Sequence, residues 1–90
     1  MTPEDIIKFI FEHEQVDYEL RAYKSRKGKL VQARQRSMYL VKHFFPLMTW
    51  DGVGSLFGQK HDGAIHAYNK VSSYIATEKM YSREIANYIK

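Results

Sequence analysis

Eight lysine and arginine side chains crowd one third of this chain, with no carboxylate among them. Residues 21–50 contain no aspartate or glutamate, whereas residues 1–20 carry six acids against one base, Lys8. The bases of the stretch are Arg21, Lys24, Arg26, Lys27, Lys29, Arg34, Arg36 and Lys42. Because lysine and arginine neutralise phosphates, such a stripe suits a polyanion, and double-stranded DNA is the natural candidate.

The residues that could carry catalysis or bind a metal ion are poorly spaced for either task. His61 and His66 are five residues apart, so they lie on different sides of a helix and do not form an i, i+4 zinc pair. His13 and His43 have no partner nearby in the sequence. The chain has no cysteine, no catalytic spacing of serine, histidine and acid, and no carboxylate pair among apolar residues. We therefore expect a binding protein that is not an enzyme and has no cofactor or metal.

Length and hydropathy bound the remaining classes. Ninety residues predict one domain with a modest core, and 44% hydrophobic residues are ordinary for a globular protein. The apolar runs are too short to span a membrane, and no signal peptide is visible at the N-terminus. We expect a cytoplasmic protein, associated with the nucleoid, that has no membrane partner.

Helix-start signals open the chain. Thr2 can accept hydrogen bonds from the first helical amides, Pro3 suits the first helical position, and the acids that follow favour the positive end of the helix dipole. The spacing predicts a helix that ends near Glu14, followed by a short helical turn that Asp17 caps. The apolar face of this helix comprises Ile6, Ile7, Ile10 and Phe11.

A basic loop over residues 23–29 should lead into a long helix over residues 30–45. Gly28 is the expected turn residue, and Pro46 ends the helix because proline disfavours helical geometry in the residue before it. One side of the helix is expected to hold Leu30, the stem of Arg34, Ser37, Met38, Val41, Phe44 and Phe45. The residues left for solvent or a ligand are Lys29, Gln32, Arg36 and Lys42.

A helix-turn-helix pattern follows over about residues 49–77. Thr49 caps a helix over residues 50–57, which Gly58 ends in a left-handed conformation, and a tight turn leads into a second helix over residues 61–77. The apolar stripe of that second helix is Ala64, Ala67, Tyr68, Val71 and Ile75. With no strand-like alternation anywhere, the sequence predicts an all-α bundle of about five to six helices.

The C-terminal segment offers a weaker signal. A last helix should start at Ser82. Three tyrosines recur every seven residues and would suit a stripe for a protein partner; they are Tyr74, Tyr81 and Tyr88. The expected helix start at Ser82 would interrupt that stripe.

Three segments of the chain resemble the C-terminal DNA-binding domain of the bacterial chromosomal replication initiator DnaA. Residues 24–27, Lys-Ser-Arg-Lys, followed by residues 31–40 are similar to its basic loop and its Ala-Arg-Gln-x-x-Met-Tyr-Leu helix. Residues 50–58 are similar to its Leu-Pro-Glu-Ile-Gly-x-Leu-Phe-Gly segment, and residues 64–71 to its Val-Leu-His-Ala-x-x-Lys-Ile segment. Order and spacing agree over nearly the whole chain.

This resemblance implies an all-helical fold with a helix-turn-helix of the Trp-repressor type, and a DNA-bound role for named residues. Arg26 would enter the minor groove, while Arg34 and Gln35 would lie near the phosphate backbone. Further phosphate contacts would come from Lys27, Lys29, Arg36 and Lys42. The recognition helix would read the major groove through Lys60, His61, Asp62 and Gly63, and His66 and Lys70 would complete that face.

The base-reading positions depart from the family pattern. Where the family usually has Asp-His-Thr-Thr or Asp-His-Ser-Thr, this chain has Lys60, His61, Asp62 and Gly63, so two hydroxyl side chains become a carboxylate and a bare backbone. A carboxylate near phosphates is repelled, although Asp62 could accept a hydrogen bond from cytosine N4. A second alignment instead treats Asp62 as the helix cap and shortens the turn by two residues.

Two further alternatives remain open from the sequence. Arg34 could contact phosphate, or its stem could be buried while it pairs with an acid such as Asp51. The chain could also be a protein-interaction module that kept the fold, lost specific DNA reading and binds a protein through its C-terminal helix. The sequence contains no Gly-x-x-x-x-Gly-Lys-Ser/Thr motif, so no nucleotide partner and no ATPase module are expected.

Overall fold

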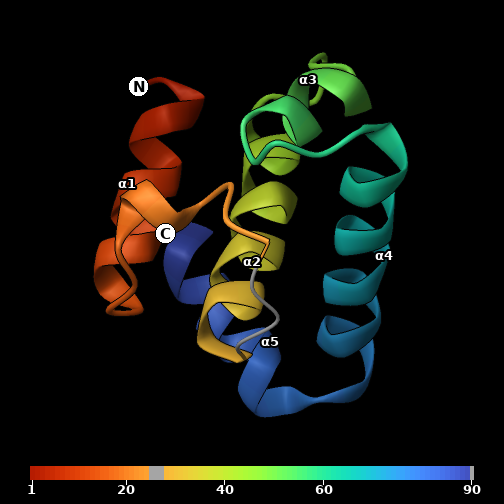
Figure 1. The fold of residues 1–90 in the computed structure, drawn as a ribbon. Helices are drawn as coiled ribbons and strands as arrows, with labels where there is room; N and C mark the ends of the chain where they lie inside the picture. The colour runs from red at the N-terminus through yellow and green to blue at the C-terminus, as the bar shows by residue number, and fades with distance from the viewer. Residues whose placement is uncertain (25–27, 90) are drawn as a thin grey trace.

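Five α-helices and one 3-10 turn make up the computed structural model, which describes residues 1–24 and 28–89. The elements are α1 (Pro3–His13), η1 (Tyr18–Leu20), α2 (Gly28–Phe44), α3 (Trp50–Ser55), α4 (His61–Thr77) and α5 (Lys79–Ile89). The long helix α2 runs through the middle, with α1 and α4 on opposite sides and α3 over one end (Figure 1). Within the described ranges there is no strand, so the expected all-α bundle is confirmed.

The N-terminal helix begins as its sequence predicts. Thr2 Oγ1 accepts a hydrogen bond from the Asp5 amide at 3.2 Å, and the Asp5 carboxylate accepts one from the Thr2 amide at 2.9 Å. These bonds from Thr2 hold the pKa of the Asp5 carboxyl below its ordinary value. Asp17 likewise caps η1, because its Oδ1 accepts from the Glu19 amide at 2.9 Å. Both predicted caps are confirmed.

The central helix starts and exposes its residues differently from the prediction. It begins at Gly28, so this glycine is the first helical residue and not a turn residue. It ends at Phe44, one residue before the expected end. Phe44 is 41% exposed although it was expected on the packed side, whereas Arg36, expected to face solvent or a ligand, is 4% exposed.

The helix-turn-helix is formed by α3 and α4. Thr49 Oγ1 accepts from the Gly52 amide at 3.0 Å, which confirms the expected cap, but α3 ends at Ser55, two residues early. Gly58 has a φ of 66°, the left-handed conformation that glycine adopts at least cost. The second helix has the predicted bounds, residues 61–77. Its N-cap is Lys60, so the alignment that made Asp62 the cap is wrong.

The last helix begins three residues earlier than the sequence suggested. The chain leaves helical geometry at Glu78, where φ is −128° and ψ is 110°, and α5 starts directly afterwards at Lys79. The break therefore lies between Tyr74 and Tyr81, and Tyr81 and Tyr88 share one helix. The rings of Tyr74 and Tyr81 nevertheless meet across the break, with centroids 5.1 Å apart.

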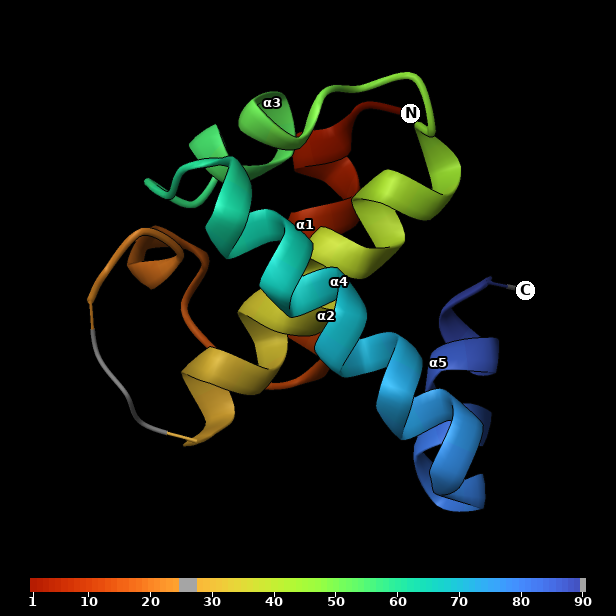
Figure 2. The same cartoon turned by 90° about the vertical axis from the view of Figure 1, so that its right-hand side faces the viewer.

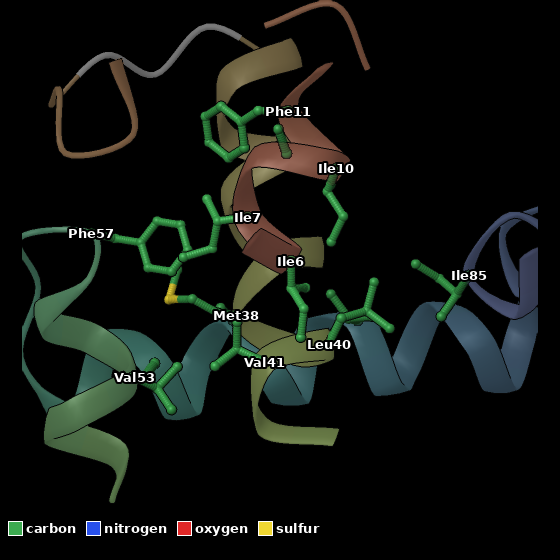
Figure 3. Close-up of a cluster of buried hydrophobic side chains, with 14 of the residues drawn as sticks. Ile6, Ile7, Ile10, Phe11, Met38, Leu40, Val41, Val53, Phe57 and Ile85 are labelled. Atoms are coloured by element: carbon green, nitrogen blue, oxygen red, sulfur yellow. The ribbon is translucent and has the colours of Figure 1, made fainter. Parts of the chain in front are cut away.

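The core lies where α1, α2 and α4 converge, closed at one end by α3 and at the other by α5 (Figure 3). Phe11 and Phe57 are its largest buried side chains, and Met38, Leu40 and Val41 of α2 belong to the same cluster. Viewed from the α4 side, α4 crosses α2 obliquely (Figure 2). Helix α4 contacts α2, α3 and α5, and its exposed residues include Asp62, His66 and Lys70.

Candidate nucleic-acid interface

The turn between α3 and α4 is held by close backbone packing at Gly54. A Cβ added there would lie 2.6 Å from the Lys60 carbonyl oxygen and 2.7 Å from that of Gln59, so only glycine leaves room for the chain to return. The Gln59 amide donates to the Gly54 carbonyl at 2.9 Å, which ties the turn to α3. The resulting arrangement sets the start of α4 directly beside α3.

The first helical amide of α4 is satisfied by a side chain from α3. Lys60, the N-cap residue, makes no side-chain cap bond. Instead, Asp51 Oδ1 accepts a hydrogen bond from the His61 amide at 3.0 Å and lies 3.4 Å from the His61 Nδ1 atom. One carboxylate thus joins the two helices of the motif and supplies the negative charge that a helix N-terminus favours.

A shallow depression separates α2 from the N-terminal half of α4. It has a volume of about 310 Å³, and Arg34 and Gln35 of α2 face Asp62, Gly63 and His66 of α4 across it. All five residues were predicted to contact DNA, and the two groups lie about thirty residues apart in the sequence. The fold therefore brings together the expected backbone-contacting pair and half of the expected major-groove face, Asp62, Gly63 and His66.

The exposed face of α4 continues beyond this depression. Asp62, His66 and Lys70 are spaced by four residues, and all three are exposed, as are Lys60 and His61 before them. His61 Nδ1 lies 3.9 Å from an Asp62 carboxylate oxygen, so two carboxylates flank this imidazole. Asp62, His66 and Lys70 therefore form an exposed series along one face of α4.

Gly63 shapes the first turn of α4. A Cβ at this position would overlap the Gln59 side chain, which folds over the bare backbone. Gln59 also lines the depression between α2 and α4. The glycine thus allows the turn residue Gln59 to lie at the same surface as Asp62.

Arg34 connects α2 to the segment before it. Its Nη1 donates to the Tyr23 carbonyl, and burial lowers the pKa of its guanidinium from the ordinary value. Asp51, considered above as an ion-pair partner, instead bonds to the start of α4. Ala22, the residue before Tyr23, lies close to the turn between α3 and α4, because its Cβ is 3.3 Å from where a Gly58 Cβ would be.

Arg36 is not available as a phosphate contact. Its guanidinium lies 2.9 Å from Glu14, which follows α1 directly, 2.8 Å from Glu84 of α5, and 4.5 Å from the centre of the Tyr81 ring. The Arg36 and Glu14 side chains are 5% and 9% exposed, respectively. These partners raise the pKa of Arg36 against the opposing effect of burial. The sequence-based assignment of Arg36 to the DNA surface is therefore corrected.

Lys42 is likewise committed within the protein. Its ammonium donates to the Pro46 carbonyl at 3.0 Å and to the Met48 carbonyl, and it lies 4.6 Å from the centre of the Trp50 ring. This lysine joins the end of α2 to the start of α3. Lys42 was expected to be left for solvent or a ligand, but its ammonium group already donates hydrogen bonds to two backbone carbonyls.

Lys29 is exposed but lies elsewhere on α2. It lines a depression with His13, Glu14 and Arg36, on the side of α2 that faces α1. Arg26 and Lys27 lie outside the described residues. The structure therefore groups Arg34, Gln35, Asp62, Gly63 and His66, with Lys60, His61 and Lys70 adjoining on α4, and leaves Lys29 apart.

Two polar clusters were missed by sequence reasoning. The Asp51 cap spans ten residues and has no local signature. A second network links α1, α2 and α5: the Tyr88 hydroxyl donates to Glu14 at 2.8 Å and lies 3.0 Å from His13 Nδ1. Arg36 was expected to face solvent or a ligand, and no local signal in the sequence joins it to Glu14 or Glu84.

Neither metal nor membrane features emerge from the described part of the chain. No group of three or more histidine, cysteine, aspartate or glutamate side chains is placed to hold a metal ion among those residues. Nor does any described helix combine the length and apolar character needed to cross a membrane.

Comparison with known proteins identifies relatives over most of the chain. The family model for the bacterial dnaA protein helix-turn-helix matches residues 3–71. The chromosomal replication initiator protein DnaA of Bacteroides thetaiotaomicron is 33% identical over 86 residues, 94% of this chain and 18% of that protein. DnaA of Bacteroides fragilis is 32% identical, covering 97% of this chain and 18% of its own length, and that of a Thermoanaerobacter species is 33% identical, covering 93% and 20%. The chain thus spans about a fifth of the curated relatives it matches.

Proposed function

The chain belongs to the bacterial dnaA helix-turn-helix family, and we propose that it binds double-stranded DNA through α3 and α4. In this proposal α4 enters the major groove and the basic segment before α2, residues 23–27, reaches the adjacent minor groove. The protein acts by binding and not by catalysis. Its biological role would be that of a replication-initiator-like or regulatory protein.

One observation carries the proposal: the depression between α2 and α4 joins Arg34 and Gln35 to the exposed stripe of Asp62 and His66. In a helix-turn-helix, residues near the start of the second helix meet base edges while neighbouring side chains hold the phosphates. A surface that presents base-reading and phosphate-binding side chains along one depression is therefore suited to bind a duplex.

The phosphate contacts differ from those expected from the sequence alone. We assign them to Lys60 and Lys70 of the exposed α4 face, to Arg34 and Gln35 of α2, and to Lys27 of the loop. Arg36 and Lys42 are withdrawn because internal partners hold their charges. Lys29 is withdrawn because it lines the depression that His13 and Glu14 also line, on the side of α2 that faces α1. We assign Arg26 to the minor groove, where a narrow groove attracts arginine through its negative potential.

A salt series tests this function. Fluorescence anisotropy with a labelled duplex should show binding at low salt, and the logarithm of the binding constant should fall linearly with the logarithm of the salt concentration. The reason is that lysine and arginine side chains that bind phosphates release the counterions condensed on the DNA. Lys60→Gln should reduce the slope by about 0.9. The matched control is Lys8→Gln, which removes the same charge from α1, on the far side of α2, and should leave the slope unchanged. Undetectable binding at low salt, or a slope near zero, contradicts the proposal.

A second candidate function rests on a different surface. An apolar depression of about 460 Å³ lies between α1, the end of α2 and α5, and includes Phe9, Phe44, Tyr88 and Ile89. Phe9 is 59% exposed there, an unusual position for a large apolar side chain. If the duplex experiment fails while a protein partner is recovered in stoichiometric amount, and Phe9→Ser abolishes that recovery, the chain is a protein-interaction module.

A further inference from the structure

We infer that Asp62 selects cytosine, its carboxylate accepting a hydrogen bond from the cytosine N4 amino group in the major groove. This inference rests on the proposed DNA-binding function and deepens it by assigning a base to one residue. It concerns a position at which this chain has a carboxylate where its family usually has a hydroxyl side chain.

The position of Asp62 suits contact with a base edge. It is the second residue of α4, its side chain is 79% exposed, and it lines the depression that Gln35 and His66 also line. Residues in the first turn of a recognition helix are those that meet base edges. Since Arg34 and Gln35 stand across the same depression, a duplex held by them would lie against Asp62.

Asp62 is not needed to cap its own helix. The described cap bond at the start of α4 comes from Asp51, whose Oδ1 accepts from the His61 amide. The contact that the structure gives for the Asp62 carboxylate is with the His61 imidazole, 3.9 Å away. The carboxylate of Asp62 is therefore exposed and accessible to a ligand.

The chemistry of a carboxylate favours cytosine among the four bases. An ionised carboxylate is an acceptor only, so it is repelled by the O6 and N7 atoms of guanine and by the O4 atom of thymine. Adenine offers an amino donor beside an acceptor, a pattern that an amide side chain matches better. Cytosine offers its N4 amino group, and aspartate and glutamate accept from it.

The same carboxylate should weaken binding to duplexes without a cytosine at this position. On such duplexes the carboxylate adds negative charge close to the phosphates and accepts no hydrogen bond from a base. Asp62 thus acts by discriminating between sequences more than by adding affinity. Removing it should raise affinity for unrelated DNA while lowering selectivity.

Selection of bound duplexes from a random pool tests the inference on the full 90-residue chain and on Asp62→Asn. The selected wild-type site should contain one position with cytosine enriched. In competition binding, replacing that cytosine should weaken the wild type at least about fivefold. Asp62→Asn should lose this preference or shift it to adenine, while the remaining positions of the site stay the same.

Two controls separate base reading from charge and from folding. Glu12→Gln removes one negative charge from the exposed face of α1 and should leave the cytosine preference intact. Asp62→Ala, checked by circular dichroism for retained helicity, should lose the preference without gaining adenine. If either Asp62 variant keeps the wild-type site at every position and only binds all DNA more tightly, the inference is overturned although DNA binding stands. If the wild type binds no duplex, the proposed function falls with it.

Discussion

The Asp51 carboxylate accepts a hydrogen bond from the His61 amide across the turn, 3.0 Å from oxygen to nitrogen. This bond joins α3 to α4 and fills the cap position that Lys60 leaves without a side-chain bond. The orientation of α4, and hence of every side chain proposed to read DNA, depends on how α3 holds its first turn.

Asp51→Ala should therefore lower stability by about 1 kcal/mol, the usual cost of losing an N-cap acceptor. Chemical denaturation monitored by circular dichroism measures this value. Asp51→Asn keeps an acceptor oxygen and should recover most of the loss. An alanine variant as stable as the parent would show that the bond contributes nothing to the fold.

The buried ion pair between Arg36 and Glu14 should be sensitive to removal of one partner. Glu14→Ala would leave the largely buried guanidinium without this carboxylate, and we expect a loss of about 3 kcal/mol in unfolding free energy. Glu84→Ala removes the other, half-exposed partner and should cost less than about 1 kcal/mol. Equal losses from the two variants in urea titrations would contradict this assignment.

Tyr88 predicts how stability changes in alkali. Burial and the hydrogen bond to Glu14 raise the pKa of its hydroxyl above the ordinary value of 10.0. The folded protein then keeps a proton that the unfolded chain releases, so this contribution is complete below about pH 10 and declines above it. Tyr88→Phe should flatten the decline in unfolding midpoint above pH 10, whereas Tyr23→Phe, at an exposed tyrosine, should follow the parent.

The close approach at Gly54 is testable by adding one methyl group. Gly54→Ala would press a Cβ against two backbone carbonyls, and we expect destabilisation of about 2 kcal/mol with a displaced turn. Gly28→Ala is the control because, among the described residues beyond its chain neighbours and its own helix backbone, no heavy atom lies within 4 Å of the added Cβ. The Gly28 variant should be neutral or stabilised by up to about 1 kcal/mol. A thermal scan that ranks the two variants the other way would contradict the packing described.

Local signals in the sequence predicted α1 and α4 well because their caps and apolar spacing lie within a few residues of each other. Gly58 was identified for the same reason, since a left-handed residue after a helix favours glycine. The early start of α5 was not predicted because the break falls at Glu78, and no glycine or proline stands there to signal it.

The sequence could predict which residues share a surface only where this follows from a residue's own helix. Arg34 and Gln35 line one depression with Asp62, Gly63 and His66. Arg36 does not, because its burial depends on Glu14 and Glu84, which lie 22 and 48 residues away in the sequence and meet only in the folded chain. Lys42 likewise finds its carbonyl partners through the path of residues 45–48.

Amide chemical-shift mapping during titration with a duplex tests the central claim most directly. We predict that the largest changes in amide chemical shift fall on Arg34, Gln35 and residues 60–70, and that the exposed residues of α1 and the end of α5 stay unchanged. Changes concentrated around Phe9 and Tyr88 instead, or no changes at low salt, would contradict a DNA interface on α2 and α4.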